Sequence, residues 1–174
     1  MDEATVLITL HELELHRLVV AKTYAPGDLD YHEAEFRQID DLQVNAVADL
    51  LETEIRIRGA VKTRVEAACG RCLGQVALPL EREFDLTYRP MSTIARDEEL
   101  ELPPGELDVG FYEGEGIQLE DVIVEQVILA FPMKVTCKED CRGLCPTCGA
   151  DRNRETCQCP EAQADSPFAA LRGQ

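Results

Sequence analysis

The sequence predicts an α+β fold: a mostly antiparallel β domain followed by a C-terminal helix and a cysteine-rich appendage. Alternating apolar and polar residues dominate positions 5–88, and an acidic stretch with Pro and Gly follows. Six of the eight cysteines then lie between Cys137 and Cys159. We therefore divide the chain into a β domain (1–95), an acidic linker (96–116), a helix (117–133), a cysteine-rich segment (134–160) and a tail (161–174).

The composition indicates a cytoplasmic globular protein. The 174 residues include 34 Asp and Glu against 17 Lys and Arg, a net charge of −17, and 45% are hydrophobic. The N-terminus lacks the pattern of a signal peptide, and the most apolar stretch, 122–131, is too short to cross a bilayer. We expect no membrane association. In the cytoplasm, cysteines are more often metal ligands or redox thiols than disulfides.

The β domain is predicted to contain a short helix near 11–19 and then a hairpin around Gly59-Ala60. Residues 55–58 and 61–65 alternate on either side of this dipeptide. A loop at 59–61 would place Arg58 opposite Lys62 and would leave one face buried. The buried face would carry Ile55, Ile57, Thr63 and Val65, and the exposed face would carry Arg56, Arg58, Lys62 and Arg64.

A second hairpin is predicted, with its turn within Cys69-Gly70-Arg71-Cys72. One face of its return strand is apolar, and the other is acidic at Glu81, Glu83 and Asp85. Pro79 cannot donate a backbone hydrogen bond, so it indicates an edge position or a bulge. The apolar face comprises Leu78, Leu80, Phe84, Leu86 and Tyr88.

The acidic linker leads into the predicted helix. Residues 97–125 contain eleven acids and no Lys or Arg, which is typical of a solvated spacer or of a docking strip for a basic protein. A helix is expected over 119–131, with Glu120 and Asp121 in its first turn and Pro132 after its end. The β-branched residues of this segment leave a strand as the alternative.

The C-terminal cysteines indicate a zinc knuckle. Cys145-Pro146-Thr147-Cys148-Gly149 places two thiolates three residues apart, and Gly149 lets the chain turn beneath an ion. Zn²⁺ prefers four tetrahedral ligands, and the spacing leaves open whether Cys157 and Cys159 or Cys137 and Cys141 complete the set. The appendage of the predicted fold is therefore a zinc-knuckle segment.

The remaining cysteines allow three arrangements. Eight thiols could form two tetrathiolate sites, or Cys69 and Cys72 could join Cys145 and Cys148 as a second metal pair. Cys69 and Cys72 could also be small thiols in a tight turn without metal.

Several functional classes have little support in the sequence. An all-thiolate site leaves no position for water or substrate, so a catalytic metal is not expected. His11 and His16 are five residues apart and do not match a zinc-protease helix. A pI near 4.5 is unfavourable for nonspecific binding of nucleic acid. The basic face from Arg56 to Arg64 remains a candidate RNA contact, although neighbouring acids could neutralise it.

Three segments together resemble the bacterial YceD-like family, the large ribosomal RNA subunit accumulation proteins. The segments are Cys69-Gly70-Arg71-Cys72-Leu73, the stretch 116–133, and 141–149 followed by Asn153 and Cys157-Gln158-Cys159. The closing 167–171 is also similar to the tail of that family.

The resemblance implies a non-enzymatic role in the synthesis, processing or stability of 23S rRNA. The implied partners are a ribosomal protein or a pre-large-subunit particle, with rRNA as a further candidate and no small-molecule substrate. One alternative function is a redox switch or holdase, in which Cys145, Cys148, Cys157 and Cys159 release zinc on oxidation. A metal-dependent enzyme is a third hypothesis.

Overall fold

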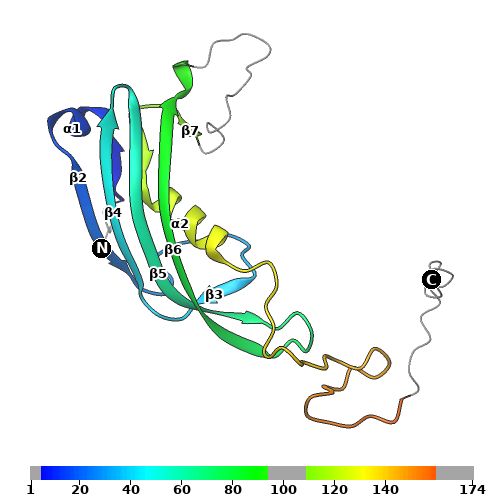
Figure 1. Cartoon of the computed structure of the whole chain (residues 1–174). Helices are drawn as coiled ribbons and strands as arrows, with labels where there is room; N and C mark the ends of the chain where they lie inside the picture. Colours follow the sequence, from blue (N-terminus) through cyan, green and yellow to red (C-terminus); the bar gives the residue numbers. More distant parts are fainter. Residues whose placement is uncertain (1–4, 94–108, 160–174) are drawn as a thin grey trace, which may run out of the picture. The chain divides into compact units, whose positions relative to one another are not determined.

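The computed structural model describes residues 5–93 and 109–159, and its chain folds into two compact units (Figure 1). The first unit comprises residues 1–66 and 77–133, and the second comprises residues 67–76 and 134–174. The first unit contains nearly all of the regular secondary structure. The second unit contains all eight cysteines.

A six-stranded sheet forms the first unit. Its strand order is β2-β4-β5-β6-β7, and β3 also pairs with β5. The β2–β4 and β4–β5 pairs are antiparallel, whereas the short β6–β7 pair is parallel. The strands are β2 (Leu18–Tyr24), β3 (Phe36–Gln38), β4 (Leu42–Leu51), β5 (Glu54–Ala68), β6 (Gln75–Pro90) and β7 (Val109–Tyr112).

Shorter elements complete this unit. β1 (Leu7–Thr9) and β8 (Gly116–Gln118) pair antiparallel in a separate sheet, and α1 (Leu10–Leu15) follows β1 directly. A 3₁₀ turn, η1 (Met91–Thr93), follows β6, and α2 (Leu119–Ala130) follows β8. The predicted architecture of antiparallel strands with a C-terminal helix is confirmed. None of the described helices has the length and apolar character that spanning a membrane requires.

The core lies between the large sheet and α2, which runs across one sheet face (Figure 1). α2 contributes Leu119, Val122, Ile123 and Val127, which are all buried. The sheet contributes the inward residues of β4 and β5, at every second position as the strand period requires. These include Leu42, Val44, Ala46, Ile55, Ile57, Val61 and Val65.

The predicted hairpin at Gly59-Ala60 is wrong. β5 continues through both residues and pairs with β4, so that Gly59 lies opposite Ala46 and Arg58 lies opposite Val47. The turn into β5 is instead at Glu52-Thr53. Because the alternation passes through Gly59 without a change of phase, the predicted buried residues Ile55, Ile57, Thr63 and Val65 are correct.

Gly59 lies where neighbouring strands approach each other closely, and not in a turn. A Cβ at this position would lie 2.4 Å from the carbonyl oxygen of Asn45 and 2.8 Å from Cζ of Phe84. Gly110, which the sequence analysis placed in the linker, has a similar role within β7. A Cβ there would lie 2.6 Å from Cε1 of Tyr88. Gly59 is therefore required by the neighbouring backbone, whereas Gly110 leaves room for the ring of Tyr88.

The second predicted hairpin is confirmed. β5 and β6 are joined by a turn in which the N–H of Leu73 donates to the carbonyl of Cys69 at 2.9 Å. The predicted apolar face of β6 points inward, with Leu80 and Phe84 buried. β7 pairs only with residues 87–90 of β6, so within the described chain Pro79 lies on a free edge, as predicted.

The predicted helix at 119–131 is confirmed as α2, which ends before Pro132. Glu120 in its first turn accepts hydrogen bonds from the N–H of Val6 (3.0 Å) and the hydroxyl of Tyr24 (2.9 Å), and it pairs with Lys22 (3.2 Å). The helix expected near 11–19 is shorter: it begins at Leu10, where Thr9 caps it, and ends at Leu15, because His16 is extended and Leu18 already begins β2.

Candidate metal centres

The eight cysteines form two separate groups of four. The four sulfur atoms of each group lie within 4.8 Å of one another. Cys69 and Cys72 therefore meet Cys137 and Cys141, not Cys145 and Cys148. The first cysteine site comprises Cys69, Cys72, Cys137 and Cys141, and the second cysteine site comprises Cys145, Cys148, Cys157 and Cys159.

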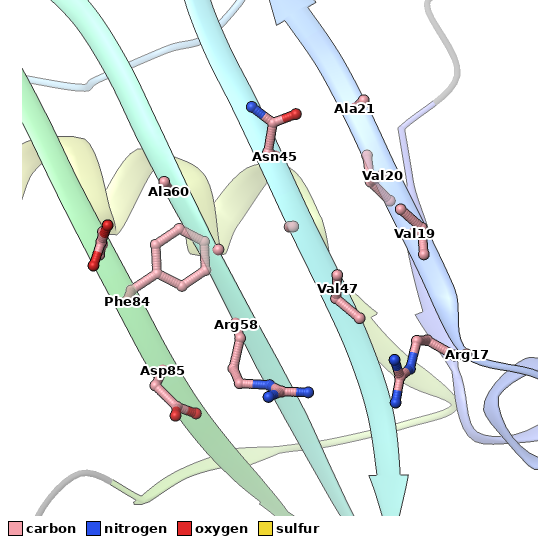
Figure 2. Close-up of a pocket in the computed structure, with 13 residues that line it drawn as sticks. Arg17, Val19, Val20, Ala21, Asn45, Val47, Arg58, Ala60, Phe84 and Asp85 are labelled. Atoms are coloured by element: carbon pink, nitrogen blue, oxygen red, sulfur yellow. The ribbon is translucent and has the colours of Figure 1, made fainter.

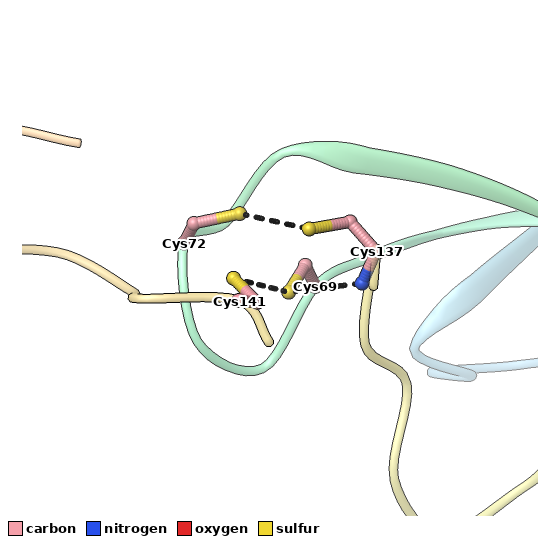
Figure 3. Close-up of side chains that lie close together, drawn as sticks. All are labelled: Cys69, Cys72, Cys137 and Cys141. Carbon is pink, nitrogen blue, oxygen red and sulfur yellow. Dashed lines mark hydrogen bonds between the residues drawn. The ribbon is translucent and has the colours of Figure 1, made fainter. Parts of the chain in front are cut away.

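The side chains of the first cysteine site point toward one another (Figure 3). The sulfurs of Cys69 and Cys141 are 3.9 Å apart, and those of Cys72 and Cys137 are 3.7 Å apart. Four sulfurs at about 2.3 Å from a zinc ion are separated by about 3.8 Å from one another. A disulfide would need a separation of about 2.05 Å. The geometry therefore fits a metal ion held by four thiolates.

Each cysteine site begins with the same backbone turn. The first cysteine of the Cys-x₂-Cys pair accepts a hydrogen bond from the N–H four residues later, and its own N–H donates to the carbonyl five residues later. The fifth residue of each turn is left-handed, Leu73 with φ 59° and Gly149 with φ 74°. The bonds are Leu73 N to Cys69 O (2.9 Å), Cys69 N to Gly74 O (2.8 Å), Gly149 N to Cys145 O (2.9 Å) and Cys145 N to Ala150 O (2.8 Å).

These turns direct backbone N–H groups at one sulfur of each site. Hydrogen bonds from the N–H groups of Cys72, Arg71 and Cys137 lower the pKa of Cys69 to about 6. The two from Arg71 and Cys137 are both 3.4 Å long. The N–H groups of Cys148 and Thr147 likewise lower the pKa of Cys145 to about 6. The turns therefore favour thiolates, which are the form that binds metal.

In each site another cysteine is harder to ionise, because it lies beside a sulfur that carries negative charge. The neighbouring sulfur of Cys141 raises the pKa of Cys137 to about 12, and Cys148 does the same to Cys159. A cation at the centre of each group would remove this repulsion.

A second layer of hydrogen bonds surrounds Cys141. The side-chain amide of Asn153 donates to the sulfur of Cys141 at 3.4 Å, and its oxygen accepts from the N–H of Arg142 at 2.9 Å. The guanidinium of Arg71 donates to the carbonyls of Glu139 and Cys141, both at 3.0 Å. Asn153 lies between Cys148 and Cys157 in the chain, so it links the segment of the second site to a ligand of the first.

The basic residues of β5 share the face of the sheet opposite α2, and each one is paired with an acid. Asp49 accepts from Arg58 at 2.7 Å, and this bond is the main cause of the lowered pKa of Asp49. Arg17 and Arg58 line a groove of about 740 Å³. Figure 2 shows the side chains that line it. The other pairs are Arg56–Asp85 (2.7 Å), Lys62–Glu81 (3.4 Å) and Arg64–Asp40 (3.5 Å).

Comparison of the sequence with known protein families identifies the family of this chain. Residues 57–173 match the family model described as large ribosomal RNA subunit accumulation protein YceD. The chain belongs to the YceD family. The match spans both cysteine sites, α2 and the strands from most of β5 onward.

The curated relatives are uncharacterized mycobacterial proteins. Uncharacterized protein Rv2926c of Mycobacterium tuberculosis is 34% identical over 113 residues, which are 63% of this chain and 48% of that protein. Uncharacterized protein ML1660 of Mycobacterium leprae is 27% identical over 113 residues, 63% of this chain and 46% of that protein. The chain thus spans about half the length of these relatives. No solved structure matches it.

Proposed function

We propose that this YceD-family protein is a non-enzymatic factor in large ribosomal subunit biogenesis that supports the synthesis, processing or stability of 23S rRNA. The observation that carries the proposal is the family match over residues 57–173, which includes both cysteine sites. The description of the family names accumulation of the large ribosomal RNA. A cytoplasmic location follows from this role.

We further propose that each cysteine site binds one structural Zn²⁺. The support is the donor set of four thiolates and, at the first site, sulfur separations of 3.7 and 3.9 Å. Four thiolates occupy all four coordination positions of a tetrahedral zinc ion, so neither water nor substrate would bind to it. The ions would hold the second unit together, because the segment 134–159 buries few apolar side chains of its own.

The partner is proposed to be a ribosomal protein or a pre-large-subunit particle rather than free rRNA. Arg56, Arg58, Lys62 and Arg64 are already paired with acids, so a phosphate would have to displace a carboxylate at each contact. The net charge of −17 instead suits basic proteins.

The test is capture of partners from cell lysate with and without ribonuclease. We expect large-subunit precursors to be enriched over 16S rRNA, and ribosomal proteins to remain bound after ribonuclease. A variant with Arg56, Arg58 and Arg64 changed to Gln should capture the same material. Equal recovery of 16S and 23S rRNA, or recovery of neither RNA nor ribosomal proteins, would contradict the proposal.

A further inference from the structure

The outer side of the helix α2 carries apolar residues beside its acids, in addition to the apolar side that faces the core. A helix at a protein surface normally has polar residues on its outer face. On α2 this face carries Val124, Ile128 and Leu129, and the side chains of Ile128 and Leu129 are 40% and 53% exposed. Val124, Ile128 and Leu129 therefore form an apolar surface on α2 that no described residue fully covers.

This surface is the floor of a groove of about 580 Å³ within the first unit. The opposite wall is the loop from Asp28 to His32, in which Leu29 is half-buried. Four exposed acids line the groove, and no Lys or Arg does. The acids are Asp28, Asp30, Asp121 and Glu125.

The charge of these four acids is not neutralised by the described cations. None of the ion pairs found in residues 5–93 and 109–159 joins them to a Lys or Arg, in contrast to the acids beside β5. Asp28 and Asp30 accept backbone hydrogen bonds from Ala25 (2.6 Å) and His32 (2.7 Å). These bonds hold the carboxylates in place but do not neutralise their negative charge. His32 also lies 3.6 Å from Asp30 and is charged only when protonated.

We propose that the groove between α2 and the Asp28–His32 loop binds a basic amphipathic helix of a partner protein. Apolar side chains of the partner, spaced at i, i+3, i+4 and i+7, would cover Val124, Ile128 and Leu129, and its Lys and Arg would meet the four acids. That the partner is ribosomal rests on the proposed function, whereas the preference for a basic helix rests on the groove alone.

Other occupants fit the groove less well. RNA and a second copy of this chain both bring negative charge to an acidic rim. An added strand would need free backbone donors and acceptors along a sheet edge, but the floor here is a helix whose backbone is already hydrogen-bonded.

Fluorescence anisotropy with the full chain tests the proposal directly. The probe is a labelled synthetic 18-residue peptide with Leu at i, i+3, i+4 and i+7 positions and Lys elsewhere. One control peptide has the same composition with the leucines scattered, and another has Glu in place of Lys. We expect the amphipathic Lys peptide to bind at least about tenfold more tightly than either control. Equal binding of the scattered peptide would overturn the proposal.

Variants of the protein locate the binding site. Asp121→Asn with Glu125→Gln should weaken binding of the peptide by about two- to thirtyfold, the effect of two exposed ion pairs. Leu129→Ser should weaken it by about tenfold. The matched control, Glu83→Gln with Glu113→Gln, removes two exposed acids outside the groove and should leave binding unchanged. An equal loss in the control, or no loss in the groove variants, would overturn the assignment.

The result also separates the two proposals. Failure of the peptide to bind, while lysate capture still enriches large-subunit precursors, would reject the groove and keep the proposed function. Peptide binding without ribosomal material in the lysate capture would keep the groove and reject a ribosomal partner.

Discussion

Changing Asn153 to Ala should weaken metal binding at the first cysteine site, although Asn153 lies between two ligands of the second. The substitution removes the amide that donates to the sulfur of Cys141 at 3.4 Å, and it frees the N–H of Arg142, now bonded at 2.9 Å. Burial opposes ionisation of Cys141, but the N–H groups of Gly143 and Asn153 lower its pKa overall. Loss of such an outer partner reduces metal affinity by about 10- to 100-fold, or about 1.4 to 2.8 kcal/mol.

Competition with a zinc-binding dye measures this change site by site. In a Cys148→Ser background only the first site keeps four thiolates, so a shift in its affinity can be assigned without ambiguity. Arg152→Ala is the control, because the exposed side chain of Arg152 bonds to neither cysteine site within the described residues and its backbone N–H still bonds to Gly143. An unchanged affinity at the first site in Asn153→Ala would show that the amide of Asn153 does not support metal binding there.

Three further predictions concern the metal and the β unit. Cys148→Ser should hold one zinc ion instead of two by native mass spectrometry, with the β-sheet signal in circular dichroism retained; global unfolding would contradict it. Gly59→Ala should reduce the free energy of unfolding in urea by about 3 kcal/mol, because the backbone of Asn45 cannot move aside. The control Gly70→Ala, whose nearest contact is at 3.6 Å, should reduce it by less than about 1 kcal/mol. Equal losses would count against the strand position of Gly59. The pKa of Glu120 is lowered in the fold, because hydrogen bonds from Tyr24, Val6 and Lys22 outweigh the effect of burial, which would raise it. The contribution of Glu120 to stability is therefore present above its ordinary pKa of 4.5 and is lost as the pH falls. Glu120→Gln should therefore destabilise the protein at pH 7, with a difference from wild type that narrows below pH 4.5; a difference independent of pH would argue against this role.

The alternation of apolar residues predicted the faces of β5 and β6 correctly, because burial of one sheet face imposes a period of two. Gly59 and Gly110 could not be placed from the sequence. In a sequence, a glycine in a turn cannot be told from one in a linker or one where two strands approach closely. Only the positions of Asn45 and Tyr88 in the fold show which role Gly59 and Gly110 have.

The cysteine grouping shows a similar limit. The spacing around Cys145 and Cys148 contains the glycine that the turn uses, whereas the equivalent turn at Cys69 has Leu73 in the left-handed position and gives a weaker signal. The partners of Cys69 lie 68 and 72 residues away in the chain, at Cys137 and Cys141. Spacing carries no information about such distant pairs, and it gives no indication of the role of Asn153.

The ratio of 23S to 16S rRNA in cells depleted of this protein tests the proposed role in large-subunit biogenesis. The ratio should fall on depletion, wild-type protein should restore it, and a variant lacking both cysteine sites should not. An unchanged ratio in cells shown to lack the protein would contradict a role in accumulation of the large-subunit RNA.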